Sequence, residues 1–225
     1  DTQDYGGNTV CLEIAEEGAP TLILNAGMGL HWLGNNLLNG AYGRGEGDAH
    51  ILLTHVHWDH IQGLPFFTPM LIPGNRACIY GPDAELASRL LAQMHESFCP
   101  VPNFFVEGIG ADIDVVEVGD CTFDIGSLHI TATRLNHCGV TGLGYRVEAG
   151  GRSIAYLPDV EYLEEAHREQ VAAMVQGVDL LFHDAMLTAE EYPSHRGSGH
   201  CSIDDDIDVA GRAGGGRLVL FGHHP

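Results

Sequence analysis

The chain has 225 residues and is strongly acidic, with 10 lysine and arginine residues against 31 aspartate and glutamate residues and a formal net charge of −21. This charge disfavours a long nucleic acid as partner, because an electronegative surface repels phosphate backbones. Hydrophobic residues make up 44% of the chain and charged residues 18%, which is typical of a globular protein with a full core. No apolar run approaches the ~20 residues that cross a bilayer, so we expect no membrane association.

Six cysteines are widely spaced without a CxxC pair, a pattern that favours reduced, buried thiols over a disulfide framework. No signal peptide is visible, and we expect a cytoplasmic protein whose chain has been trimmed at both ends, Asp1 and Pro225. Histidine is unusually frequent, with 14 residues. This frequency points towards metal binding.

The predicted elements form two sheets covered by helices. Strands are predicted at residues 8–15, 21–25, 51–54, 114–118, 128–134, 144–149, 153–157, 179–183 and 217–221. Helices are predicted at residues 31–38, 83–97, 162–175 and 202–212, and a loop at residues 100–110. The first two strands form a hairpin, and no linker or repeat divides the chain. Residues 1–225 are therefore expected to form a single domain.

The strongest chemical signal is the hexapeptide His55-Val-His57-Trp-Asp59-His60, which directly follows the apolar run 51–54. Imidazole nitrogens and carboxylate oxygens suit zinc and similar divalent ions, and four such groups within six residues can serve two adjacent metals. The alternative is a chance cluster of histidines on a surface loop.

With this hexapeptide the sequence resembles the metallo-β-lactamase-fold hydrolases over nearly the whole chain. The further segments that carry the resemblance are Tyr5-Gly6-Gly7-Asn8-Thr9, Leu22 to Gly27, Asn136-His137, Tyr156-Leu157-Pro158-Asp159 and Gly199-His200-Cys201-Ser202. The resemblance implies an α+β fold of the αββα type, with two mixed β-sheets packed face to face and helices on the outer faces. It also implies a binuclear metal site at one edge, between the sheets.

The resemblance also implies a ligand set. The ligands are His55, His57 and His137 for one divalent ion and Asp59, His60 and a late histidine for the second, with Asp159 as the bridge. We favour His223 as the late histidine, with His224 as its rival. Zinc is the expected metal, with manganese or iron as alternatives. His137 could instead be an ordinary loop histidine, and Asp159 the N-cap of the helix predicted from Tyr162.

Two residues are candidates for proton transfer. Asp59 could orient or deprotonate the bridging water, and His200 could protonate the leaving alkoxide. The stretch around His200 is similar to the Gly-His-Ser-Thr motif of the phosphodiesterase branch, although a helix-start loop with Ser202 as the cap is the alternative. Asp184 is a candidate to orient a metal-ligand imidazole, or else a surface loop carboxylate.

One position departs from the family pattern. Relatives usually end the second strand with Asp-Ala-Gly, whereas this chain has Asn25-Ala26-Gly27. Loss of a negative acceptor there is expected to weaken metal affinity or to alter proton handling near the site.

The ligand set narrows the reaction class that the resemblance implies. Asp159 in place of a cysteine disfavours a dedicated β-lactamase, and His57 in place of a carboxylate disfavours a flavodiiron oxygen reductase. His137 and Asp159 are only 22 residues apart, which leaves no room for the long arm of the tRNA 3′-processing nucleases. The chain length also leaves no room for the helical domain of glyoxalase II-type thioesterases.

These exclusions predict a phosphodiesterase that cleaves a small cyclic or nucleotide-like phosphodiester by metal-bound hydroxide, with His200 as general acid. Hydrolysis of an acyl, lactam or thioester substrate on the same centre is the alternative. A degenerate metal-binding sensor without turnover is a further one, prompted by Asn25. Analogy with the relatives suggests a homodimer.

Overall fold

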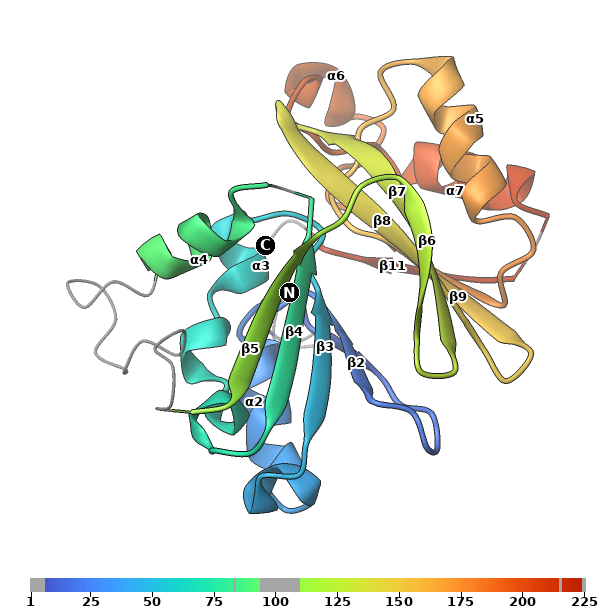
Figure 1. The fold of residues 1–225 in the computed structure, drawn as a ribbon. Helices are drawn as coiled ribbons and strands as arrows, with labels where there is room; N and C mark the ends of the chain where they lie inside the picture. Colours follow the sequence, from blue (N-terminus) through green and yellow to red (C-terminus); the bar gives the residue numbers. More distant parts are fainter. Residues whose placement is uncertain (1–6, 83, 94–109, 215, 224–225) are drawn as a thin grey trace. The chain divides into compact units, whose positions relative to one another are not determined.

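The computed structural model describes residues 7–82, 84–93, 110–214 and 216–223. The chain divides into two compact units, Asp1–Val118 and Gly119–Pro225. Each unit contains one mixed β-sheet and its own helices (Figure 1). The expectation of two mixed sheets accompanied by helices is therefore confirmed. That residues 1–225 form a single domain stays a prediction.

The sheet of the first unit is mostly parallel. Its strands, in their order across the sheet, are β1 (Leu12–Ile14), β2 (Thr21–Leu24), β3 (Asp48–Leu52), β4 (Arg76–Gly81) and β5 (Asp112–Glu117). β1 and β2 form the predicted antiparallel hairpin, and β2 to β5 run parallel. Because parallel strands end at the same edge of a sheet, the segment that follows β3 lies at the carboxyl edge.

Helices cover one face of this sheet. They are α2 (Gly29–Leu37), α3 (Trp58–Ile61) and α4 (Leu86–Gln93), with 3-10 turns η1 (Ala41–Arg44), η2 (Leu64–Phe66) and η3 (Thr68–Leu71). Three neighbouring strands contribute the fully buried residues Ile23, Ile51 and Ile79. They share one hydrophobic cluster with Leu30 and Leu90 of the helices. Packing in this cluster fixes the strands, and with them the carboxyl edge of the sheet.

The sheet of the second unit joins an antiparallel meander to three parallel strands. The strands are β6 (Cys121–Ile125), β7 (Leu128–His137), β8 (Val140–Ala149), β9 (Arg152–Leu157), β10 (Leu180–Asp184) and β11 (Arg217–Phe221), in the order β11-β10-β9-β8-β7-β6. β6 to β9 are antiparallel, and β9, β10 and β11 are parallel. Asp159 and Asp184 come at the shared carboxyl ends of the parallel strands β9 and β10.

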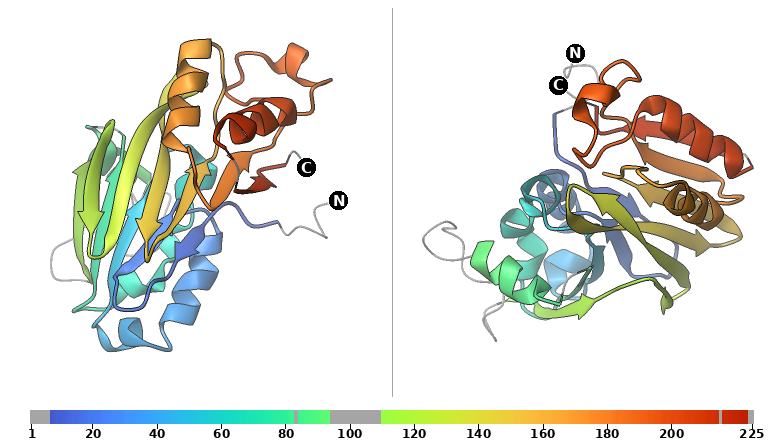
Figure 2. Two further views of the ribbon diagram at one scale, coloured as in Figure 1. Left: turned by 90° about the vertical axis from the view of Figure 1, so that its right-hand side faces the viewer. Right: turned by 90° about the horizontal axis from the view of Figure 1, so that it is seen from above.

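The parallel strands of the second unit are connected through helices. α5 (Glu165–Met174) and α7 (Ile203–Arg212) lie side by side on one face of the sheet (Figure 2), and the short α6 (Tyr192–His195) precedes α7. Val171 and Val209 of these helices pack in one cluster with Leu157 and Leu181 of the strands. Arg168 links α5 to α7 through Asp205 at 2.6 Å.

The structure differs from the sequence-based elements in a few places. β4 and β6 were not predicted, and β7 extends through His137, which the sequence placed just after the strand. The β7–β8 pairing continues to the turn at Cys138 and Gly139, where φ is 40° and 74°, and this pairing keeps His137 in the strand. The helix predicted at 83–97 is observed as α4, and residues 94–97, like 100–109 of the predicted loop, lie outside the described residues.

Among the residues that the structure describes, no helix has the length and apolar character needed to cross a membrane.

Ser202 caps α7, and its loss should destabilise the second unit. The backbone N–H of Asp205 donates to Ser202 Oγ, while Asp205 Oδ2 accepts from the backbone N–H of Ser202, which forms a capping box. We expect Ser202→Ala to lower the free energy of unfolding by about 1 kcal/mol, measured by urea titration. Ser88→Ala, in the exposed part of α4, is the control. Equal midpoints for the two variants would contradict the capping role.

Candidate metal centre

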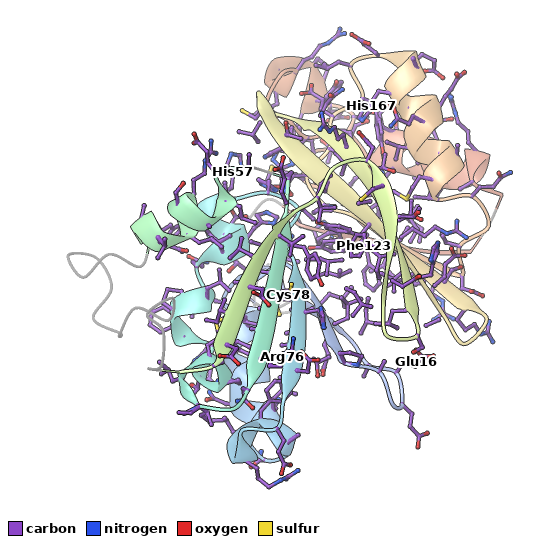
Figure 3. The ribbon with its side chains drawn as sticks, in the orientation of Figure 1. Glu16, His57, Arg76, Cys78, Phe123 and His167 are labelled. Carbon is purple, nitrogen blue, oxygen red and sulfur yellow. The ribbon has the colours of Figure 1, made fainter. Side chains whose placement is uncertain are left out.

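The hexapeptide follows the end of β3 and leads into α3. Figure 3 shows His57 at the opposite end of the first sheet from Arg76, which begins β4. His55 and His60 are each 2% exposed, and their ring centroids lie 4.2 Å apart. The ring centroids of His55 and His57 lie 4.5 Å apart. The first unit therefore brings three imidazoles together at the carboxyl edge of its sheet.

Asn25 lies directly after β2 and connects two of these imidazoles to the backbone. It is fully buried and has a φ of 60°, a conformation that asparagine tolerates better than most residues. Its Oδ1 accepts from the backbone N–H of Thr54 at 2.8 Å and from the Thr54 hydroxyl at 3.1 Å. Its Nδ2 lies 2.6 Å from Nδ1 of His60. The Thr54 hydroxyl in turn lies 3.1 Å from Nδ1 of His55.

Asp59 is the most exposed of the candidate ligands in the first unit. Its side chain is 54% exposed, and its Oδ2 lies 3.1 Å from Nε2 of His60. The predicted pairing of Asp59 and His60 in one ligand set is therefore compatible with their closeness, although their role as ligands stays a prediction.

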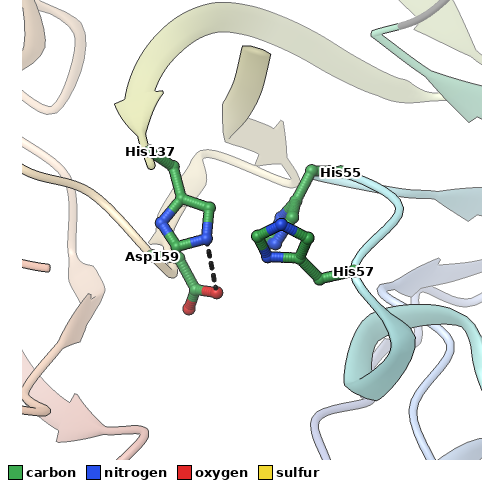
Figure 4. Close-up of side chains that lie close together, drawn as sticks. All are labelled: His55, His57, His137 and Asp159. Carbon is green, nitrogen blue, oxygen red and sulfur yellow. Dashed lines mark ion pairs between the residues drawn. The ribbon is translucent and has the colours of Figure 1, made fainter. Parts of the chain in front are cut away.

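In the second unit, the side chains of His137 and Asp159 lie close together. His137 Nε2 lies 3.6 Å from Asp159 Oδ2 (Figure 4), and His137 Nδ1 lies 2.8 Å from the carbonyl oxygen of Gly199. Because a carbonyl only accepts, Nδ1 carries the proton of the neutral ring and Nε2 carries the lone pair. Asp159 does not cap α5, whose N-cap is Glu164.

Gly199 can approach His137 this closely only because it has no side chain. Its φ is +93°, and a Cβ atom would lie 2.5 Å from His137 Nδ1 and 2.6 Å from the backbone nitrogen of Cys138. Both the backbone conformation and the available space therefore require glycine at this position.

His200 is held by a buried carboxylate. Its Nδ1 lies 2.7 Å from Oδ2 of Asp184, which is 2% exposed. Asp184 also accepts from the backbone N–H groups of Val160 and Met186. Burial raises the pKa of the Asp184 carboxyl above its ordinary value, and the hydrogen bond with His200 opposes this shift. Asp184 is thus not a surface carboxylate, and its imidazole partner is His200, which lies outside the predicted ligand set. That Asp184 orients a ligand imidazole stays a prediction.

Ligand-type atoms gather around this pair. One atom each of Asp159, Asp184 and His200 lie within 4.8 Å of one another. A second group that meets the same distance limit is formed by His183, Cys201 and Asp206, all of which are fully buried. The members of the second group hydrogen-bond to one another and are described below.

The sequence did not single out three residues that fix this part of the structure. Tyr162 lies 2.7 Å from His183 Nε2, and Asp206 Oδ1 lies 3.0 Å from His183 Nδ1 and accepts from the Cys201 thiol at 2.8 Å. Burial raises the pKa of this thiol well above its ordinary value, so Cys201 is protonated and donates. This network connects the end of β10 to the loop that carries His200.

Glu161 is a fourth residue that fixes this part of the structure, and no motif pointed to it. Its carboxylate is 2% exposed and accepts three hydrogen bonds, from Tyr192 OH at 3.1 Å, from the backbone N–H of Gly197 at 2.7 Å and from that of Gly199 at 2.9 Å. Glu161 therefore holds the loop whose carbonyl at Gly199 orients His137. A glutamate two residues after a predicted ligand was the available signal.

The predicted last ligand, His223, has its Nδ1 3.3 Å from the carbonyl oxygen of Ala185. Within residues 7–82, 84–93, 110–214 and 216–223, none of the groups of clustered ligand atoms includes it. Its rival His224 lies outside the described residues. The identity of the last ligand stays a prediction.

The chemistry of the donor set fits a divalent metal. His137 presents Nε2 with a lone pair, and the same holds for His55, because the Thr54 hydroxyl donates to Asn25 and so accepts from His55 Nδ1–H. This hydrogen bonding of the distal ring nitrogen is the usual arrangement of metal-ligating histidines. Each unit also offers a carboxylate, Asp59 in the first and Asp159 in the second, and carboxylate oxygens suit zinc and related ions.

The two mixed sheets with helices, and the imidazole and carboxylate donors at the strand ends, define a metal-binding protein of the metallo-β-lactamase fold. The family model described as the beta-lactamase superfamily domain matches residues 21–224, so the chain belongs to this superfamily. The expected fold class is confirmed, and membership of the superfamily confirms the expected class of enzyme, a metal-dependent hydrolase.

Known relatives agree with this membership. Ribonuclease Z of Porphyromonas gingivalis is 24% identical in an alignment that covers 78% of this chain and 71% of the relative. The crystal structure of the short form of human tRNase Z is 22% identical, with a TM-score of 0.68, over 96% of this chain and 86% of that one. A diphosphatase of the PhnP family is 19% identical, with a TM-score of 0.65, over 96% of this chain and 73% of that one.

We expect Glu161→Gln to loosen the loop at Gly197 and Gly199. A glutamine has one acceptor oxygen, so the backbone N–H of either Gly197 or Gly199 would face the amide nitrogen and lose its partner. This should lower the free energy of unfolding by about 1–3 kcal/mol and speed amide hydrogen exchange at both glycines.

Tyr192→Phe is the matched control, because it removes one hydrogen bond to Glu161 and leaves both backbone donors bound. Its exchange at Gly197 and Gly199 should match the wild type. If Glu161→Gln behaves like Tyr192→Phe in both measurements, the carboxylate does not hold the loop.

Proposed function

We propose that this protein is a metal-dependent phosphodiesterase that cleaves a small cyclic or nucleotide-like phosphodiester. The observation that carries the proposal is the pair of His200 and Asp184, joined at 2.7 Å beside Asp159. An imidazole backed by a buried carboxylate is suited to hold a proton and to deliver it to a leaving group.

The proposed ligand set is the one that the family resemblance implies. His55, His57 and His137 would hold one ion, Asp59, His60 and His223 would hold the second, and Asp159 would bridge them. The tautomers of His55 and His137 support their part of this assignment. Two zinc ions are proposed, with manganese or iron as alternatives. In such a site the metals supply a nucleophile from water at neutral pH and stabilise charge on the phosphoryl oxygens.

His200 has the role of general acid in the proposal. Its Nδ1–H donates to Asp184, whose negative charge stabilises the doubly protonated ring. The proton on Nε2 then passes to the alkoxide oxygen as the bond between phosphorus and that oxygen breaks. Asp59, exposed and next to His60, is proposed to orient the attacking water.

The relatives support phosphate-ester chemistry over acyl transfer. Their names describe a ribonuclease and a diphosphatase, and both substrates contain phosphoryl groups. A small substrate is proposed here because the net charge is −21 and because only 22 residues separate His137 from Asp159. The homodimer and the cytoplasmic location stay predictions.

Turnover should be measured with zinc-loaded protein on bis(p-nitrophenyl) phosphate and on cyclic nucleotides. The general-acid role predicts that His200→Ala lowers kcat by about 10²–10⁴-fold on a cyclic nucleotide, whose alkoxide leaving group needs a proton. The same variant should lose much less on bis(p-nitrophenyl) phosphate, because p-nitrophenolate is stable without protonation.

His195→Ala is the control, since His195 is an exposed histidine close in sequence that contacts Glu191 and Ser194. No turnover of any phosphodiester by metal-loaded wild type would count against the proposal. Equal losses on both substrates would remove His200 from the acid role. Hydrolysis of lactams or thioesters that His200→Ala retains would favour the acyl alternative.

A further inference from the structure

The hydrogen bonds around His60 have a fixed direction. The backbone N–H of Thr54 can only donate, and its acceptor at 2.8 Å is Asn25 Oδ1. The NH₂ group of Asn25 must therefore face His60 Nδ1, 2.6 Å away. Because that NH₂ group also only donates, Nδ1 of His60 is the acceptor and the proton of the neutral ring is on Nε2.

The other side of the ring agrees with this tautomer. His60 Nε2 lies 3.1 Å from Oδ2 of Asp59, and a carboxylate oxygen accepts the hydrogen bond that an Nε2–H group donates. This contact is compatible with a proton on Nε2, which the contact with Asn25 fixes.

The tautomer of His60 is the opposite of that of His55 in the same hexapeptide. His55 donates from Nδ1 to the Thr54 hydroxyl and keeps the lone pair on Nε2. His137 in the second unit has the same tautomer as His55. A ligating nitrogen must offer a lone pair, so the tautomers of His55 and His137 are ready for a metal through Nε2 and that of His60 is not.

We infer that Asn25 makes the His60 position the weaker of two unequal metal positions, by holding the His60 imidazole in the tautomer with its proton on Nε2. This inference rests on the proposed metal centre. Coordination through Nε2 requires the proton to move to Nδ1, where it would face the NH₂ group of Asn25. Rotating that amide instead would set its NH₂ against the Thr54 N–H. In either arrangement two hydrogen-bond donors face each other without an acceptor. This is costly because the side chains involved are at most 2% exposed.

Aspartate at position 25 removes this conflict. Its two oxygens accept from both sides, one from the Thr54 N–H and one from a proton on His60 Nδ1. The lone pair of His60 then lies on Nε2, and aspartate tolerates the φ of 60° as asparagine does. The substitution also adds one negative charge beside His60, so the tautomer is read directly from the ring in addition to the metal affinity.

The test combines zinc titration and nuclear magnetic resonance on the full chain. Wild type, Asn25→Asp and the control Asn39→Asp, which adds a charge at an exposed position, are titrated with zinc in competition with a chromophoric chelator. We expect two unequal zinc affinities in the wild type and in Asn39→Asp. In Asn25→Asp the weaker affinity should rise by about 10–100-fold, with the tighter one unchanged.

The tautomer is read in the metal-free protein from the ¹⁵N shifts of the His60 ring, assigned by the loss of its signals in His60→Gln. The proton should be on Nε2 in the wild type and on Nδ1 in Asn25→Asp. A wild-type proton on Nδ1, equal zinc affinities, or no change in Asn25→Asp would overturn the inference. These measurements need no substrate, so an absence of phosphodiesterase activity would not affect them.

Discussion

One backbone group in each unit fixes the tautomers of the candidate ligand histidines, namely the N–H of Thr54 in the first unit and the carbonyl of Gly199 in the second. Neither group can reverse its role, because an amide N–H only donates and a carbonyl only accepts. The first sets the direction of the Asn25 amide, and the second places the proton of His137 on Nδ1. The chemistry offered by each imidazole therefore follows from where the main chain runs, and the main chain is held by the buried clusters of each unit.

Both units place their polar groups at the carboxyl ends of parallel strands. In the first unit Asn25 and the hexapeptide follow β2 and β3, and in the second Asp159 and Asp184 stand at the ends of β9 and β10. Strand ends suit a binding site because the strand itself is rigid and buried. The residues beyond its end are no longer hydrogen-bonded to the neighbouring strands, so their side chains can point towards a ligand.

Many of the strands and candidate site residues could be predicted from the sequence. The remaining contacts could not, because they join residues that are far apart in the chain. Apolar runs followed by His55 and Asp159 indicated strands and ligands together, and Ser202 with Asp205 is a recognisable cap. Glu161 was missed because its partners are backbone N–H groups 36 and 38 residues away, which no local pattern contains. Asn25 was noticed as a missing charge, but the direction of its amide depends on a contact with Thr54 that only the fold creates.

An acidic protein and an anionic substrate are compatible if cations bind at the carboxylates of the candidate site. Asp159 and Asp184 bring negative charge close together, and burial raises the pKa of Asp184, so the cluster is unfavourable unless a cation or a protonated imidazole offsets it. Bound divalent cations would reverse the local sign and attract one phosphate group, whereas the remaining surface, at a net charge of −21, would still repel a polyanion. A single phosphodiester can approach such a centre at small cost, since it brings one negative charge, and each further phosphate must meet the acidic surface without a metal to balance it.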